Sequence, residues 1–151
     1  MKIDVNWWWA AVVSVFSYVI CPNSAYVPAV IAVWVAVVLD IFTRWYANAR
    51  NGGGLYRALK SRAINSDAFW DGTKSKIVSY LVVQILAGLT MRVEQWATLS
   101  GAVVTVIYSI MFIREFISNL ENLQDAGANW VGPLLCFMRK KEKEITKNEE
   151  E

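Results

Sequence analysis

Asp40 closes a stretch of the chain, residues 5–39, that contains no charged residue. Arg44 follows four positions later, so an ion pair between the two side chains is available if the segment is helical. An ionisable group at the edge of an apolar segment can respond to a membrane potential or a pH gradient when that segment lies in a bilayer. A capping or interfacial carboxylate is the alternative interpretation of Asp40.

The rest of the sequence offers no catalytic, metal-binding or cofactor-binding constellation. The chain has no histidine, which excludes Ser-His and Cys-His nucleophile pairs and histidine metal sites. Cys21 and Cys136 have no C-x-x-C spacing, and Asp67 and Asp71 lack further metal ligands nearby. The glycine run at 52–54 lacks the signature of a phosphate-binding loop. We therefore expect a protein that is not an enzyme and that needs no cofactor.

The elements that must position Asp40 are apolar segments. The chain is 56% hydrophobic and 19% charged, whereas an average soluble domain carries about 25% charged residues. Its charges are also segregated, which favours membrane insertion over a soluble core. Four segments are expected to be helices, at residues 3–20, 25–42, 77–91 and 97–113. They do not alternate with period two, and an open sheet would leave backbone groups unpaired in lipid.

Residues 44–76 form a basic connection between the two pairs of apolar segments. This connection holds seven basic and two acidic residues, and short basic loops stay on the cytoplasmic side of a membrane. Four spans would then place both termini in the cytoplasm of a multi-pass protein. A two-span arrangement, with one pair of segments merely interfacial, is the main rival. The Trp7-Trp8-Trp9 cluster suits the headgroup region.

The sequence therefore predicts an all-α membrane protein with about four short transmembrane helices in two hairpins. Its single domain divides into a first hairpin (1–43), a basic cytoplasmic loop (44–76), a second hairpin (77–113), an amphipathic cytoplasmic segment (114–138) and a charged tail (139–151). The third segment, at 1.5 Å a residue, covers about 22 Å, against a hydrocarbon core of about 30 Å. Oligomerisation and bilayer thinning both relieve such a mismatch.

Small residues recur every four positions along the fourth segment, at Ala97, Gly101, Thr105 and Ser109. Such a stripe lets two helix backbones approach closely in lipid, where no hydrophobic force drives association. We predict that it is a packing face. The pattern leaves open whether it packs within one chain or between two chains.

A series of motifs resembles the phage holins that are grouped with the toxin-secretion holins of clostridia. The motifs, in order over residues 30–138, are Leu39-Asp40-Ile41-Phe42-Thr43, Ser66, residues 72–76, the stretch Ser118-Asn119-Leu120-Glu121-Asn122-Leu123, Gly127 and Pro133-Leu134. Within the cytoplasmic part of the pattern, Ser118, Glu121, Asn122, Gly127 and Pro133 are the matching positions. Many members of the family have Gly where this chain has Arg44, and the Trp-rich N-terminus has no counterpart.

The resemblance implies a small protein of the bacterial cytoplasmic membrane that is made late in phage infection. It implies homo-oligomers that form lesions in the bilayer, through which an endolysin reaches the cell wall or, in the secretion variant, a toxin leaves the cell. Nucleic acid is not an expected partner, because the basic loop is tethered at the membrane. A non-lytic scaffold that anchors a larger assembly is the alternative function. A transporter is disfavoured, since Gln84 is the only strongly polar residue deep in a span.

Overall fold

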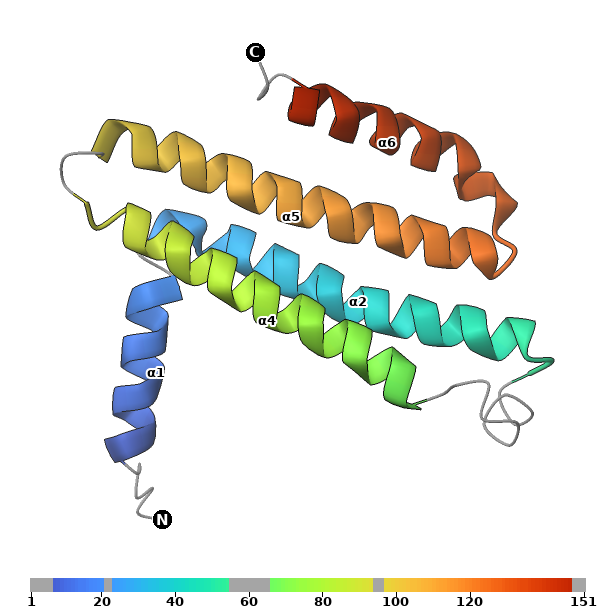
Figure 1. The fold of residues 1–151 in the computed structure, drawn as a ribbon, viewed down its shortest axis with the longest axis horizontal. Coiled ribbons are helices and arrows are strands. Elements are labelled where there is room, and N and C mark those ends of the chain that lie inside the picture. The colour runs from blue at the N-terminus through green and yellow to red at the C-terminus, as the bar shows by residue number, and fades with distance from the viewer. Residues whose placement is uncertain (1–6, 21–22, 55–65, 94–96, 148–151) are drawn as a thin grey trace.

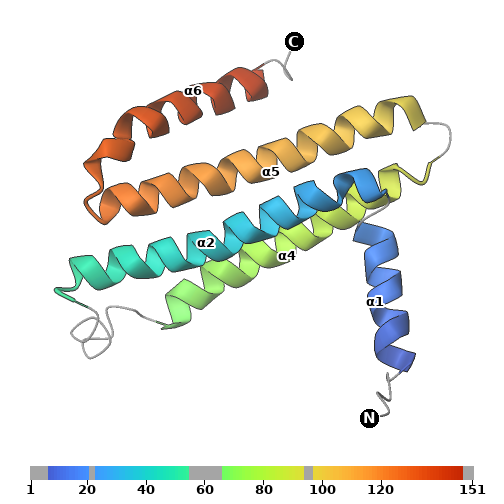
Figure 2. The ribbon, with the colours of Figure 1, turned by 180° about the vertical axis from the view of Figure 1, so that it is seen from behind.

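The protein is built of helices, as a computed structural model that describes residues 7–20, 23–54, 66–93 and 97–147 shows (Figures 1 and 2). The helices are α1 (Trp7–Ile20), α2 (Val27–Asn51), α4 (Ser66–Thr90), α5 (Ala97–Asp125) and α6 (Gly132–Lys147), with short 3-10 turns η1 (Ser24–Tyr26) and η3 (Asn129–Val131). These ranges contain no strand. The all-α prediction is confirmed.

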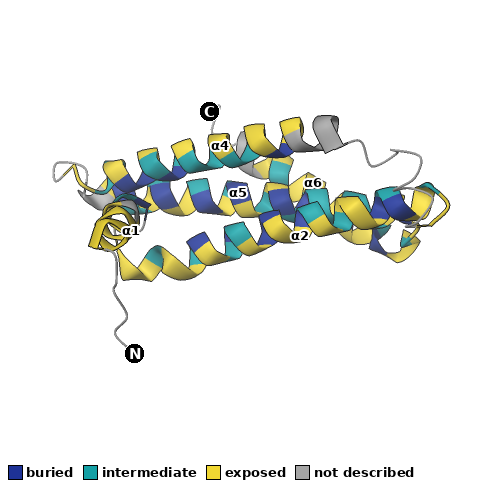
Figure 3. Cartoon of the chain, turned by 90° about the horizontal axis from the view of Figure 1, so that it is seen from below, coloured by how far each residue is buried: buried dark blue, intermediate teal, exposed yellow. Residues whose placement is uncertain are grey.

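Helices α2, α4 and α5 run alongside one another and form a bundle (Figures 1 and 2). Their buried faces meet along its axis, and their outward faces are largely exposed (Figure 3). One apolar core is made by Ile20, Val30, Val33, Ala87, Val104, Tyr108 and Met111. Exposed apolar side chains also cover the outside, among them Ile31, Val35 and Leu39 of α2 and Val78, Val82 and Leu86 of α4. Helices that are apolar on all sides are typical of a lipid environment.

Two helical stretches in the described ranges are long and apolar enough to cross a membrane, Ser24–Asn51 and Leu99–Asp125. The protein itself buries only 28% and 33% of their most apolar windows, whereas the core helix of a soluble protein is mostly buried. This agrees with the predicted membrane character. The count of four spans and the pairing into two hairpins remain predictions.

The basic connection at 44–76 is helical at both ends. α2 continues through Arg44 to Asn51, and α4 already begins at Ser66. The extension of α2 is held by packing, because Ala47 and Ala49 are buried. Residues 55–65 of this connection lie outside the described residues.

α1 points away from the bundle, crosswise to its helices, and is seen nearly end-on in Figure 3. The C-terminal end of α1 is bound to Arg92, which follows α4, and to Tyr108 of α5. The Arg92 guanidinium lies 3.6 Å from the centre of the Tyr18 ring and donates to the Tyr18 carbonyl oxygen at 3.0 Å. The Tyr108 hydroxyl donates to the Ile20 carbonyl oxygen at 3.3 Å. These donors satisfy terminal carbonyl groups that a helix leaves unpaired.

Gly88 makes the contact between α1 and α4 possible, because a Cβ atom there would overlap the Val19 carbonyl oxygen. We expect Gly88→Ala to separate the end of α1 from α4. The yield of crosslinking between Val19→Cys and Ile85→Cys, two positions that line one cavity, should fall in this variant. Gly72→Ala is the matched control, since its Cβ would meet no atom within 4 Å. Equal yields in the two variants would contradict the prediction.

α5 has neighbours on two opposite sides, α2 and α6 (Figure 1). A second apolar cluster joins α5 to η3 and α6 through Ile117, Leu120, Val131 and Leu135. Between the two helices, Gly127 has a φ of 86°, the left-handed conformation with which many helices end. The amphipathic helix expected after residue 113 is therefore a continuation of α5, and the charged tail begins within the separate helix α6.

Candidate functional site

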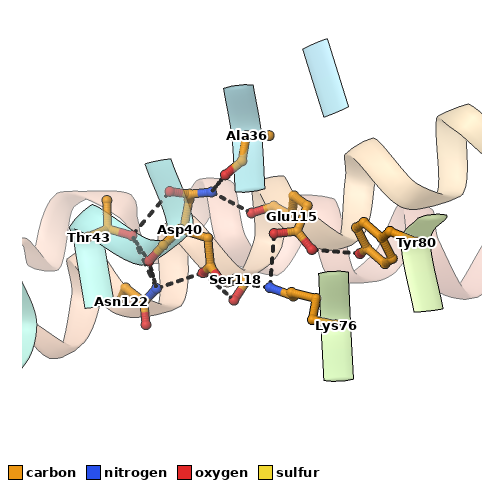
Figure 4. Close-up of polar contacts among 9 residues, drawn as sticks. Ala36, Asp40, Thr43, Lys76, Tyr80, Glu115, Ser118 and Asn122 are labelled. Atoms are coloured by element: carbon orange, nitrogen blue, oxygen red, sulfur yellow. Dashed lines mark hydrogen bonds and ion pairs between the residues drawn. The ribbon is translucent and has the colours of Figure 1, made fainter. Parts of the chain in front are cut away.

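Asp40 lies at the centre of a buried polar network where α2, α4 and α5 meet (Figure 4). Its side chain is 8% exposed. The Oδ2 atom accepts from the Lys76 ammonium of α4 at 2.7 Å. The Oδ1 atom accepts from the Ser118 hydroxyl at 2.6 Å and from the Asn122 amide at 2.8 Å, both on α5. One carboxylate of α2 thus binds both neighbouring helices.

Glu115 of α5 is the second carboxylate of the network, and its side chain is 1% exposed. Lys76 donates to Glu115 Oε2 at 2.9 Å, and the Tyr80 hydroxyl donates to Oε1 at 2.6 Å. All four carboxylate oxygens of Asp40 and Glu115 therefore have donors. The Lys76 side chain is 28% exposed, and its single ammonium group is shared between two buried carboxylates. Such a group is stable only while its hydrogen bonds are complete.

Neutral side chains surround the charged ones. The Asn119 amide donates to the Ala36 carbonyl oxygen of α2 at 3.0 Å, and its Oδ1 accepts from the Thr43 hydroxyl at 3.1 Å. Thr43 Oγ1 in turn accepts from the Asn122 amide at 3.1 Å. Because asparagine amides can donate and accept at once, Asn119 and Asn122 fix the register of α5 against α2.

The network lies where the apolar part of each of the three helices ends. Asp40 follows the charge-free residues of α2, Lys76 precedes the apolar run at 77–91, and Glu115 follows the run at 97–113. Since these three side chains are in contact, the three apolar segments stop at one height along the bundle. This is the arrangement expected of helices that leave a bilayer together.

A polar cavity of about 560 Å³ adjoins the network between α4 and α5. Lys76, Glu115, Ser75 and Ser79 line it, together with Glu142 of α6. Its described lining comes from α4, α5 and α6, so the cavity borders the network on the side away from α2.

The sequence-predicted residues fall into two groups. Asp40, Ser118 and Asn122 meet in the network, whereas Glu121 accepts from Arg139 of α6 at 2.6 Å. Pro133 is exposed in the first turn of α6. Arg44 is exposed on α2, and its pairing with Asp40 remains a prediction.

The predicted packing stripe is divided along α5. Gly101 faces η1, the turn that precedes α2, and its carbonyl oxygen accepts from the Tyr26 hydroxyl at 3.2 Å. Thr105 and Ser109 are exposed beside a cavity of about 390 Å³ that α2 also lines. The side chain of Ala97 lies outside the described residues.

Lys76, Tyr80 and Glu115 are functional-site candidates that the sequence reasoning did not single out. The position of Glu115 indicates a buried carboxylate. It follows Met111 by four residues and Tyr108 by seven, so it shares their helix face, and both of those residues are buried. A carboxylate on the buried face of a helix requires a partner. The partner itself lies on another helix and cannot be found from spacing within α5.

Gln84 is also buried, and its Oε1 atom accepts from the Trp34 indole at 3.1 Å. Its Nε2 atom has no hydrogen-bond partner in the described part of the chain. This polar residue thus joins α4 to α2.

The ion pairs of α6 are exposed, whereas the carboxylates of the network are buried. The hydrogen bond to Glu121 and its negative charge raise the pKa of Arg139. The hydrogen bond from Lys141, at 2.6 Å, and its positive charge lower the pKa of Glu144. Both pairs are solvent-screened, so each adds little to stability.

Comparison with known proteins identifies the family. Residues 24–141, which include α2, α4, α5 and the whole of the polar network, match the bacteriophage holin family. No curated protein and no solved structure matches the chain. The match confirms the resemblance given by the Asp40, Ser118 and Asn122 motifs, and it covers most of the chain. The chain therefore belongs to the bacteriophage holin family.

Proposed function

We propose that this holin collects in the cytoplasmic membrane of the host bacterium, forms homo-oligomers and opens lesions. Through these lesions an endolysin reaches the cell wall and the cell lyses. Toxin release is the alternative cargo within the same mechanism. The observation that carries the proposal is the common height at which three apolar segments end on one buried network, within a chain of the holin family.

The proposed topology places α2, α4 and α5 across the bilayer. The basic residues that follow α2, together with α6, are on the cytoplasmic side, in keeping with the distribution of positive charge in membrane proteins. The apolar segments of α4 and α5, with 15 and 17 residues, cover about 22–26 Å at 1.5 Å a residue. Spans that short favour oligomers.

We propose that the network sets the moment of lesion formation. While it is intact, Asp40 and Lys76 hold α2 against α4, and Glu115 holds α5 against α4 through Lys76. Ser118 and Asn122 of α5 hold that helix against α2 through Asp40. Its charges lie at the edge of the hydrocarbon, where loss of the membrane potential changes their energy. Arg44, one helical turn beyond Asp40, contributes to the same field. Loosening of these contacts would free helix faces for contacts between copies.

The exposed part of the small-residue stripe is the proposed contact between copies. Thr105 and Ser109 lie on the outside of α5, where a neighbouring helix can approach closely. Gly101, by contrast, is occupied by Tyr26 of the same chain.

Induced expression in bacteria, together with an endolysin that lacks an export signal, tests the function. We expect growth to stop abruptly after a delay, followed by release of the endolysin and a fall in turbidity. Cells that express the endolysin alone are the control and should keep growing. Steady growth with a stable membrane-bound complex would contradict the holin proposal and favour the alternative, a non-lytic membrane scaffold or anchor.

A further inference from the structure

α1 is the element that the holin family does not account for, since the family match begins at residue 24. It has 14 residues, or about 21 Å at 1.5 Å a residue, which is shorter than the hydrocarbon core of about 30 Å. It lies crosswise to α2, α4 and α5 in all three views (Figures 1, 2 and 3). If those helices cross the bilayer, α1 runs along its surface.

One face of α1 is turned toward the bundle, in the corner that α1 forms with α4. Trp8, Val12, Val15 and Val19, spaced as one stripe of a helix, line a cavity of about 460 Å³ together with Ile85 of α4. The lining consists of apolar surface. Because Ile85 lies within the apolar run of α4, this corner opens toward the hydrocarbon.

The opposite face of α1 carries the two serines of the helix, next to the exposed Val13. Ser14 and Ser17 are both exposed and lie, at 100° a residue, on the side away from Val12 and Val15. Arg92 is attached beside this face through the Tyr18 ring and carbonyl. A helix with an apolar stripe toward the acyl chains, hydroxyl groups toward the headgroups and Trp residues at its start fits the boundary between these two layers.

We propose that α1 lies in the plane of the outer leaflet, with the stripe Trp8, Val12, Val15 and Val19 on lipid acyl chains and the N-terminus outside the cytoplasm. The inference rests on the proposed function, because it takes the basic connection after α2 as cytoplasmic. The occupant of the corner is lipid rather than a second copy. The stripe continues the exposed apolar surface of α4, at Val82 and Leu86, which lipid already covers in a membrane-spanning bundle.

Thiol labelling in intact cells tests this placement, before the onset of lysis and with a membrane-impermeant maleimide. The background variant carries Cys21→Ser and Cys136→Ser and must still arrest growth. Single cysteines are then introduced as Lys2→Cys, as the matched pair Ser14→Cys and Val15→Cys, and as Asn51→Cys at the end of α2. We expect labelling from outside at positions 2 and 14. Position 15 should stay unlabelled, because a thiol in lipid does not ionise, and position 51 should react only after permeabilisation.

Each other result has a distinct meaning. Labelling of Asn51→Cys in intact cells would contradict the proposed topology itself. If position 51 is protected but Lys2→Cys also reacts only after permeabilisation, α1 crosses the membrane as the fourth span and the inference is wrong. Equal labelling at positions 14 and 15 would show that the stripe is not in lipid. Efficient disulfide-linked dimers of Val15→Cys would identify a second copy as the occupant and would also overturn it.

Discussion

Lys76→Met should lower the free energy of unfolding by about 3–5 kcal/mol, the cost of removing one partner from a buried ion pair. The physical reason is that Asp40 and Glu115, with side chains 8% and 1% exposed, share this one ammonium group. Without it, two carboxylates stay buried and repel each other. Unfolding of the purified protein in lipid nanodiscs, followed by helical circular dichroism, measures the loss.

Lys74→Met is the matched control for this prediction. Lys74 lies two residues away on α4 and its ion pair with Asp71, at 4.0 Å, is exposed, so we expect no measurable change. Adding Glu115→Gln to Lys76→Met removes one of the two unpaired charges and should restore part of the lost stability. A Lys76→Met protein as stable as its Lys74→Met counterpart would exclude the network as the tie between the three helices.

Asp40→Asn should bring lysis forward while membrane insertion stays intact. The asparagine side chain keeps an oxygen for Ser118 and Asn122, but it places an amide group opposite the Lys76 ammonium. The α2–α4 contact thereby loses one charged hydrogen bond, with a cost of about 1.5–3 kcal/mol. Turbidity after induction gives the onset of lysis, and the amount of protein in the membrane fraction gives insertion.

Asp71→Asn is the control for the Asp40 variant, because Asp71 is an exposed carboxylate of α4 that belongs to no part of the network. Its lysis onset should equal that of the unchanged protein. If Asp40→Asn reaches the same amount in the membrane and also keeps that onset, Asp40 has no part in timing, and its role is limited to packing.

The long apolar helices could be predicted from sequence, because hydropathy alone identifies them. The predicted segment 25–42 overlaps α2 from residue 27 onward, and the segment 97–113 falls within α5. The continuation of α2 to Asn51 could not be predicted, since its polar residues resemble a loop and the burial of Ala47 and Ala49 depends on tertiary packing. The fold of α6 back along α5 was missed for the same reason.

Several residues of the site could be predicted from the sequence, but the hydrogen bonds and ion pairs between them could not. Asp40 stands out at the end of a charge-free stretch, and Ser118 and Asn122 stand out in the family motif. Nothing in their spacing shows that they bond to each other. In the sequence, Lys76 is one of seven basic residues of a predicted loop. In the structure it lies on α4 and binds two carboxylates, one from α2 and one from α5.

The common height at which the apolar segments end also divides the protein into an apolar part and a polar part. In the proposed orientation, residues 41–51 of α2 and 116–125 of α5 project about 15 Å into the cytoplasm at 1.5 Å a residue. η3 and α6 pack along this projecting part through Val131 and Leu135. In that orientation α6 lies in water beside α5, so the part of α5 that carries Ser118 can be reached from the cytoplasm without entering the bilayer.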